Sequence, residues 1–298
     1  MSKLAVGIGA VAIISAGGYY GITTHTTSKI KENVDSAITE FENKSNSEIS
    51  YENIKVNIFN KKTTIENVDF LASDGTKGRI DSVELNGLIS STSIPDKVSV
   101  YFDNIRLDDQ THFEDLKTEF PFVDDFVMDF GLKYEFNEKK GTHSTSINGG
   151  LEDLFSFSGD LNLGNIADVW NEMKLAAKEE RDINIKSTNP EAITLDSLSF
   201  TAIDNGLLDG MLEKDAKKKG ITVEELRSIG IKGLQNDKSV PDSIKPEIAK
   251  YLSGNASKIT VTVKPNGALT IASLPLLVMH PDKEALIDRF NITLKSSN

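Results

Sequence analysis

Histidine and carboxylate side chains are the residues of this sequence best suited to acid–base or metal chemistry. His25, His112, His143 and His280 lie in separate segments, so the sequence pairs none of them. His112 stands in the acidic stretch 108–115, an oxygen-rich set that could hold a cation, but its spacing fits no calcium-binding loop. A run of charges is usually a solvated surface, so we expect no metal site here.

Motifs of nucleophilic and nucleotide chemistry are missing as well. The chain has no cysteine, which excludes disulfides, thiolate catalysis and thiolate metal sites. It has no G-x-S-x-G, H-E-x-x-H or P-loop sequence. Gly7–Ala12 matches G-x-G-x-x-A, but its apolar run continues straight on and no second strand ending in an acid follows. We therefore expect no enzyme, no cofactor and no metal.

Charge and length narrow the class of protein further. The 298 residues carry a formal net charge of -12, with a pI near 4.9. A nucleic-acid backbone would be repelled, and no stripe of lysine and arginine offsets this, so nucleic-acid binding is not expected. The length and the 38% hydrophobic content suit one large globular domain or two modest ones.

The N-terminal segment, residues 1–27, predicts a membrane anchor or a signal segment. Leu4–Ile22, LAVGIGAVAIISAGGYYGI, is uncharged and about long enough to cross a bilayer as a helix. The small residues Ala16, Gly17 and Gly18 could serve as a cleavage site, so an uncleaved anchor and a cleaved signal both stay open. With the short basic end inside, we expect the rest of the chain to lie outside the cytoplasm.

Two kinds of periodicity follow this segment. Residues 28–48 carry apolar side chains at helical spacing, which predicts an amphipathic linker helix. The apolar residues of this helix are Ile30, Val34, Ile38 and Phe41. From Ser50 the period changes to two, which is typical of half-buried antiparallel strands.

One hexapeptide pattern recurs five times in the strand region. Each copy reads apolar, acid, Asn or Ser, apolar, any, apolar. The copies are Tyr51–Val56, Ile65–Phe70, Ile80–Leu85, Phe102–Leu107 and Leu195–Phe200. Apolar residues three and then two apart share one face of a strand only if an extra residue is absorbed as a β-bulge, for which Asn and Ser are well suited. Repeated bulges would curl the sheet into a trough with one apolar face; alternatively, the pattern merely marks strand ends and turns.

The remaining chain predicts further strands and helices. Strands are expected at 127–136, 142–148, 155–163, 182–187, 192–203, 258–264, 269–273 and 290–295. Helices are expected at 166–181, from 207 to Gly220, from the capping box Thr222–Glu225 onward, and at 241–252 and 282–288. The predicted class is α+β: an N-terminal transmembrane helix, then a curled, mainly antiparallel β-sheet domain at 49–298 with a helical insertion at about 204–253.

Several phrases of this chain resemble a known family. TIENVDF, YFDNIRL, DNGLLDGMLEKDAKKKGITVEELR and NASKITVTVKPNGALTIASLP are similar to the YdgA-like bacterial envelope domain of unknown function, and more loosely to AsmA-like periplasmic proteins. The resemblance implies curled sheets in the periplasm, a single pass through the bacterial inner membrane, and a link to lipid handling and envelope assembly. It implies no catalytic residues. A cleaved signal would instead give a soluble periplasmic protein.

Together these observations predict a non-enzymatic, membrane-anchored periplasmic protein that binds a lipid or other apolar ligand on the concave face of its sheet. The side chains expected to line that face are Ile54, Val56, Val68, Phe70, Val83, Leu85, Val98, Val100, Ile105, Leu107, Leu198 and Phe200. Each could instead be plain core. The alternative function is a protein-binding scaffold of the cell envelope, with sheet edges or the insertion at 204–252 contacting an envelope protein.

Overall fold

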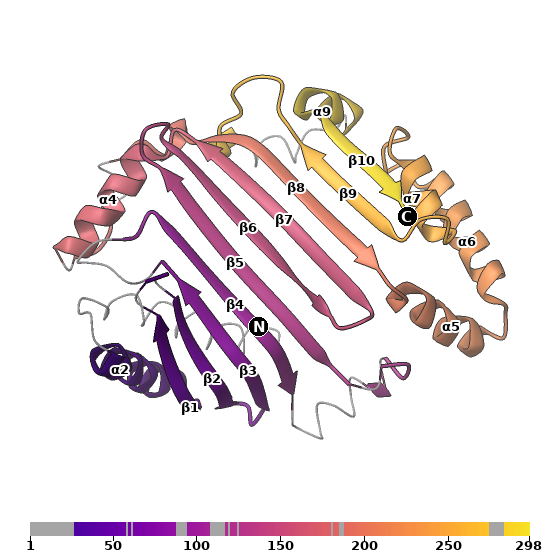
Figure 1. Cartoon of the computed structure of the whole chain (residues 1–298). Coiled ribbons are helices and arrows are strands. Elements are labelled where there is room, and N and C mark those ends of the chain that lie inside the picture. Colours follow the sequence, from indigo (N-terminus) through magenta and orange to yellow (C-terminus); the bar gives the residue numbers. More distant parts are fainter. Residues whose placement is uncertain are drawn as a thin grey trace. The chain divides into compact units, whose positions relative to one another are not determined.

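The computed structural model describes most of the chain after the N-terminal segment. The described residues are 27–57, 59–60, 62–87, 94–107, 117–118, 120–123, 125–179, 181–184, 188–273 and 283–298. They form an α+β structure with ten strands and several helices (Figure 1). The chain divides into two compact units. Unit 1 comprises Met1–Phe136 and Val169–Thr188, and unit 2 comprises Asn137–Asp168 and Asn189–Asn298.

Unit 1 is an antiparallel meander whose strand order is the chain order. Its strands are β1 (Glu48–Asn57), β2 (Lys62–Leu71), β3 (Lys77–Asn86), β4 (Lys97–Leu107) and β5 (Val127–Asn137). Its helices are α2 (Thr27–Ser45) and nearly all of α4 (Ala167–Lys178). The first four hexapeptides lie on β1, β2, β3 and β4, as the sequence predicted.

Helix α2 packs on β1 and on the apolar face of unit 1 (Figure 1). Its four predicted apolar residues, Ile30, Val34, Ile38 and Phe41, are all buried in one cluster with side chains of β1–β4. The helix ends before Asn46, whose left-handed φ of 54° turns the chain directly into β1. The predicted amphipathic helix is thus confirmed as an element, and its stripe supplies the cover of the sheet.

Helix α4 is joined to the rest of unit 1 by the single tryptophan, Trp170. Its ring stacks on Phe136 with centroids 4.8 Å apart, and it meets Tyr134 edge to face at 5.8 Å. The indole Nε1 donates a hydrogen bond of 3.1 Å to Asp96, which also pairs with Lys174 at 2.6 Å. Aromatic contact and a charged partner therefore fix the start of α4 against β5.

Unit 2 is a second antiparallel meander in chain order. Its strands are β6 (Thr142–Leu151), β7 (Phe155–Gly164), β8 (Thr194–Asp204), β9 (Lys258–Val263) and β10 (Ile292–Ser297). Its helices are α5 (Leu207–Lys219), α6 (Val223–Asn236), α7 (Lys245–Leu252) and α9 (Lys283–Phe290), with short 3-10 turns η2 (Pro190–Ala192) and η3 (Ile271–Ser273).

The helices α5, α6 and α7 lie where the sequence predicted a helical insertion. Gly220 ends α5 in the left-handed conformation, with φ of 69°. Thr222 and Glu225 form the predicted capping box at the start of α6, each side chain accepting from the other residue's backbone N–H. Local capping chemistry therefore determines where these helices begin and end.

Two predicted strands differ from the structure, although residues 185–187 of the first lie outside the described residues. Residues 182–184 of the predicted strand 182–187 have no regular structure, because the chain leaves α4 through a turn built on Arg181. The segment 269–273 does not pair back on β9. Instead the N–H groups of Leu195 and Ile271 bond to the carbonyls of Leu269 and Ile193, so this segment joins the start of β8 and then turns as η3.

The predicted membrane span, Leu4–Ile22, lies outside the described residues. Among the helices that are described, none combines the length and apolar character needed to cross a bilayer.

Candidate functional site

The polar centre of each hexapeptide marks a place where the buried face of the strand changes phase. In β2, Thr63 and Ile65 are buried before this point, and Val68 and Phe70 are buried after it. The same switch occurs at one level across β1, β2, β3 and β4. Because both partners carry the extra residue there, the register between them stays unbroken.

The predicted bulge is visible where a hexapeptide meets a strand without one. Against β5, the register of β4 shifts between Phe102 and Ile105. Asn104 takes a left-handed φ of 54° at this point. Its N–H donates to Asp129 over 2.9 Å, and its Nδ2 donates to Asp81 over 3.0 Å. Asparagine suits the position because it tolerates this backbone and bonds locally.

The fifth hexapeptide also carries a bulge. The register between β7 and β8 shifts between Asn162 and Leu163, opposite Asp196. Leu195, Leu198 and Phe200 thereby share one face of β8, as the pattern predicted. The phrase that recurs along the chain is therefore a structural device for changing the phase of a strand.

Carboxylates gather near the bulge of unit 1. Burial, followed by the charges of Asp129, Asp81 and Glu84, raises the pKa of Asp103 above its ordinary value. Arg106 lies 3.5 Å from Asp81 and offsets part of this charge. These groups bond to neighbouring strands, and among the described residues no set of His, Asp and Glu side chains is placed to hold a metal ion. We interpret the cluster as the polar side of the bulge.

The apolar residues predicted to line a groove lie mostly in the core of unit 1. Those that are buried, at 0–8% exposure, are Ile54, Val68, Phe70, Val83, Leu85, Val98 and Val100. Val56, Ile105 and Leu107 are partly buried and pack against the same cluster. The cluster includes the stripe of α2, so a helix of this chain covers the face on which a ligand was expected.

The two predicted residues of unit 2 have different surroundings. Leu198 is 39% exposed and Phe200 is 40% exposed, although both point to the same face as buried Leu195. The fourth and sixth residues of the fifth copy thus share one face of their strand, as in the other copies, but this face is only partly covered. In place of a core, β8 presents apolar side chains to solvent.

These side chains belong to a continuous surface, the unit 2 apolar face, made by Phe157, Leu161, Leu198, Phe200, Val261 and Leu294. Phe200 stands opposite Gly159 on β7 and Val261 on β9, while Leu198 stands opposite Leu161 and Val263. The rings of Phe157 and Phe200 stack at a centroid distance of 6.2 Å. The side chains of Ile147 and Phe200 lie close over Gly159, where a Cβ would be 3.1 Å from Ile147 and 3.5 Å from Phe200.

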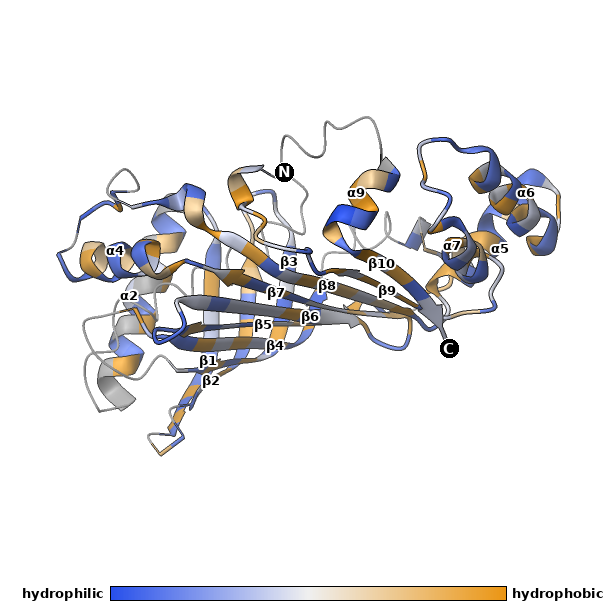
Figure 2. Cartoon of the chain, turned by 90° about the horizontal axis from the view of Figure 1, so that it is seen from above, coloured by the Kyte–Doolittle hydropathy of each residue, from blue (hydrophilic) through white to orange (hydrophobic). Residues whose placement is uncertain are grey.

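Helices α9 and α7 stand on either side of this surface, and Figure 2 shows both on the same side of β8–β10. Leu286 and Phe290 of α9 pack with Leu195 and with the Leu163 end of the sheet. At the other end, Glu247 of α7 accepts hydrogen bonds from the N–H and Oγ of Ser296, at 2.8 and 2.7 Å. The helices thus cover the two ends of the face and leave Leu198 and Phe200 accessible between them.

The other face of the unit 2 sheet is polar. Along β7 and β8 its side chains are Ser156, Ser158, Asp160, Asn162, Ser197, Ser199 and Thr201. Asn162 donates to Ser197 over 2.9 Å, and Thr201 bonds to Thr260 across β9 at 3.1 Å. An ordinary one-sided sheet buries its apolar face, so the exposure of Leu198 and Phe200 needs a reason other than the strand pattern.

His143 is the one histidine within the described residues. It lies on β6 opposite Leu163, and its Nε2 is 2.8 Å from the Oγ1 of Thr145. Burial lowers its pKa below the ordinary value, so the ring is neutral near pH 7. The other three histidines, His25, His112 and His280, lie outside the described residues.

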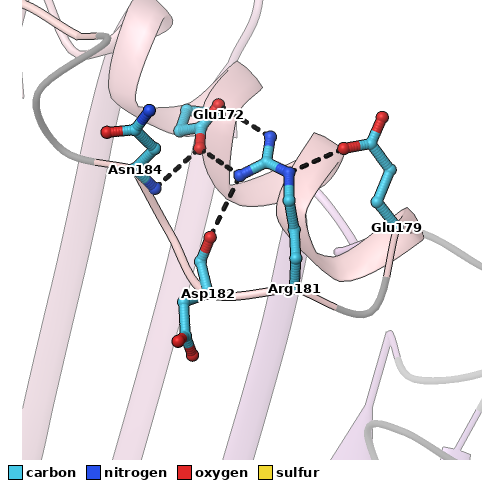
Figure 3. A network of polar contacts seen from close by, with 5 residues as sticks. All are labelled: Glu172, Glu179, Arg181, Asp182 and Asn184. Atoms are coloured by element: carbon cyan, nitrogen blue, oxygen red, sulfur yellow. Dashed lines mark hydrogen bonds and ion pairs between the residues drawn. The ribbon is translucent and has the colours of Figure 1, made fainter.

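One ionic network in the described part of unit 1 was missed by the sequence reading. Arg181 donates to both carboxylate oxygens of Glu172, at 2.6 and 3.2 Å, and also to Glu179 (Figure 3). The backbone N–H of Asn184 donates to Glu172 as well, over 2.7 Å. Hydrogen bonds to Glu172 and Glu179 raise the pKa of Arg181, which stays charged. Arg181 and Asn184 both bond to Glu172, so we interpret the network as one that holds the chain after α4 against that helix.

Comparison with known proteins adds a family but no activity. A family model described as an uncharacterized protein matches residues 149–297, a range that contains β7, β8, β9 and the unit 2 apolar face. Among curated proteins, none matches the chain. The family description mentions neither YdgA nor AsmA, so that resemblance stays a prediction.

Proposed function

The chain belongs to the family whose model matches residues 149–297, and because that family's description names no activity, we propose a function from the residues themselves. We propose that the protein is a non-enzymatic, membrane-anchored protein of the bacterial envelope that binds an acyl chain. The ligand would lie on the unit 2 apolar face, between α7 and α9.

The observation that carries this proposal is the exposure of Leu198 and Phe200, at 39% and 40%. They stand in the middle of a sheet, on a strand paired on both sides. Neighbouring apolar side chains left accessible on one face of a folded protein can mark an interaction site. Fully burying an exposed side chain of this kind is worth about 1.5–3 kcal/mol, so a ligand that covered the part of Leu198 and Phe200 still exposed would gain a fraction of this at each residue.

An acyl chain fits this surface better than a polar ligand does. Phe157, Leu161, Leu198, Phe200 and Val261 offer carbon surface and no charged group. The polar side chains of these strands project from the opposite face. The predicted membrane segment Leu4–Ile22 would keep the protein close to a source of lipid.

A lipid-retention experiment tests the proposal. A form without residues 1–27 is expected to be soluble and folded, and native mass spectrometry of that form, purified without detergent, is expected to show lipid bound. Phe200→Asp should abolish the retained lipid and keep the circular dichroism of the parent. Thr201→Asp, the neighbouring position on the polar face, is the matched control and should retain lipid. A parent form that carries no lipid, even after incubation with oleate, would refute the proposal.

A second candidate function, a protein-binding scaffold, is favoured by the helical insertion. Met211 on α5 and Ile229 on α6 are 45% and 58% exposed, and no residue of α6 is buried. An envelope protein could therefore contact this surface. Replacing both residues with serine should leave lipid retention unchanged, and loss of a cross-linked envelope partner in that variant would identify the insertion as its binding site.

A further inference from the structure

The turn between β1 and β2 presents a phenylalanine that contacts nothing else. Phe59 is fully exposed, at 102%. In the described part of this turn, the side chain of Asn57 accepts from the N–H groups of Phe59 and Asn60, at 3.1 and 3.3 Å. Asn60 in turn accepts from the N–H of Lys62 over 3.2 Å. Among the described residues, these bonds use asparagine side chains and backbone N–H groups, and the ring of Phe59 has no part in them.

The direction in which this tip points follows from the packing of α2 on β1. Glu42 bonds to Ile49 near the turn that joins the two elements, and Asp35 bonds to Tyr51 farther along. Helix and strand therefore run antiparallel. The start of α2 at Thr27 and the end of β1 at Asn57 must lie toward the same end of unit 1.

Their reach is set by the geometry of the two elements. From Asp35 back to Thr27 the helix rises about 12 Å, at 1.5 Å per residue. From Tyr51 to Asn57 the strand extends about 20 Å, at 3.3 Å per residue. Measured from their shared contact, the tip therefore extends about 8 Å farther than the start of the helix, from the same end of unit 1.

In the chain, the predicted anchor comes directly before the start of α2. Four residues, Thr23–Thr26, separate the end of the apolar segment at Ile22 from α2. Even fully extended they span only about 14 Å. If Leu4–Ile22 crosses the bilayer, the start of α2 is held close to the lipid surface, and the β1–β2 tip projects toward that surface.

We propose that Phe59 inserts into the lipid surface beside the anchor and so fixes the orientation of unit 1 on the membrane. This inference rests on the anchor in the proposed function. A single exposed apolar residue is common on protein surfaces. Phe59 differs because it is wholly exposed, its backbone is bonded by Asn57, and it lies toward the end of unit 1 at which α2 starts. Aromatic rings are favoured at this depth of a bilayer.

Tryptophan quenching by brominated lipid tests the insertion in the full chain. The chain is reconstituted into phosphatidylcholine vesicles in which part of the lipid carries bromine on its acyl chains. Phe59→Trp should show a blue-shifted emission that the brominated lipid quenches. The parent protein reports on Trp170 alone, which is 4% exposed in the core of unit 1 and should not be quenched.

Ser73→Trp is the matched control, because Ser73 is exposed in the β2–β3 turn at the opposite end of β2. It should give water-exposed emission without quenching. A full chain that floats with the vesicles while Phe59→Trp stays unquenched would overturn the insertion and leave the anchor intact. A chain that does not float would overturn both the anchor and the insertion.

Discussion

The two units use the same strand device but differ in what covers the apolar face. In unit 1, α2 lays four apolar side chains on the sheet, and Val83 and Leu85 beneath it are 0% and 1% exposed. In unit 2, α7 and α9 take only the ends of the face, and Leu198 and Phe200 stay open. Equivalent positions of one repeated phrase thus become core in one unit and surface in the other. The strand pattern determines the face, and the neighbouring helix determines whether that face is buried.

An introduced carboxylate should give the largest difference in stability between variants of unit 1 and variants of unit 2. Val83→Asp places a carboxylate without a partner in the core of unit 1, at a cost of several kcal/mol. We expect unit 1 to unfold, seen as loss of near-ultraviolet signal from Trp170. Phe200→Asp places the same charge on the unit 2 apolar face, at a side chain that is 40% exposed, and should stay folded. Equal damage from both variants would refute the distinction between core and surface.

Truncating an apolar side chain to alanine should also destabilise unit 1 more than unit 2, but by less than an introduced charge does. Leu85→Ala leaves a cavity under α2 and should lower the free energy of unfolding by about 2–5 kcal/mol. Leu198→Ala removes a side chain that is already partly hydrated, so it should cost clearly less. Chemical denaturation of both variants, followed by circular dichroism, measures the difference. A larger loss at Leu198 would mean that its surroundings are those of a core.

The bulge of unit 1 should depend on Asn104. Alanine there loses the bond to Asp81 and must hold a φ of 54°, at a cost of roughly 1–2 kcal/mol. Glycine loses the same bond but adopts this backbone freely, so Asn104→Gly should be the milder change. In thermal melts, the difference between the alanine and glycine variants reports the backbone strain. The difference between glycine and the parent reports mainly the lost hydrogen bond. If alanine proved no worse than glycine, the bulge conformation would not explain the asparagine.

The smallest effect should come from the edge of unit 2. Hydrogen bonds from Lys250 and then from Ser296 lower the pKa of Glu247 to about 2. Because the pKa is lower in the folded state, Glu247 stabilises the fold at pH values above its unfolded-state pKa of 4.5. This stability is lost as the pH falls toward the folded-state pKa of about 2. Glu247→Gln should therefore melt lower than the parent at neutral pH and converge with it at about pH 2. Glu213→Gln, at an exposed position of α5, should change the melting profile little.

Local chemistry made much of the fold predictable. The helical stripe of α2, the capping box at Thr222 and the strands that carry the hexapeptides follow from spacing and residue type alone. The segment 269–273 was misassigned because its alternation does not say which strand it joins, and it joins the start of β8. The Arg181–Glu172 network was missed because acids and bases are too frequent in this chain for one pair to stand out.

The candidate site was predictable only in part. The spacing of apolar residues correctly predicted that Leu198 and Phe200 lie on the apolar face of their strand, as Val83 does on its own strand. Exposure depends on where α2, α7 and α9 come to lie, and this is a property of tertiary packing that one strand does not carry. The sequence therefore identified the face and could not separate its open part from its covered part.

Labelling of single cysteines tests the central claim most directly, because the chain has no cysteine of its own. In the form without residues 1–27, Leu198→Cys should react quickly with a maleimide, and Val83→Cys should react only as fast as unit 1 opens. Adding oleate should slow the reaction at position 198 and leave that of Ser199→Cys, on the opposite face, unchanged. Equal protection at 198 and 199, or none at either, would contradict binding of an acyl chain on the unit 2 apolar face.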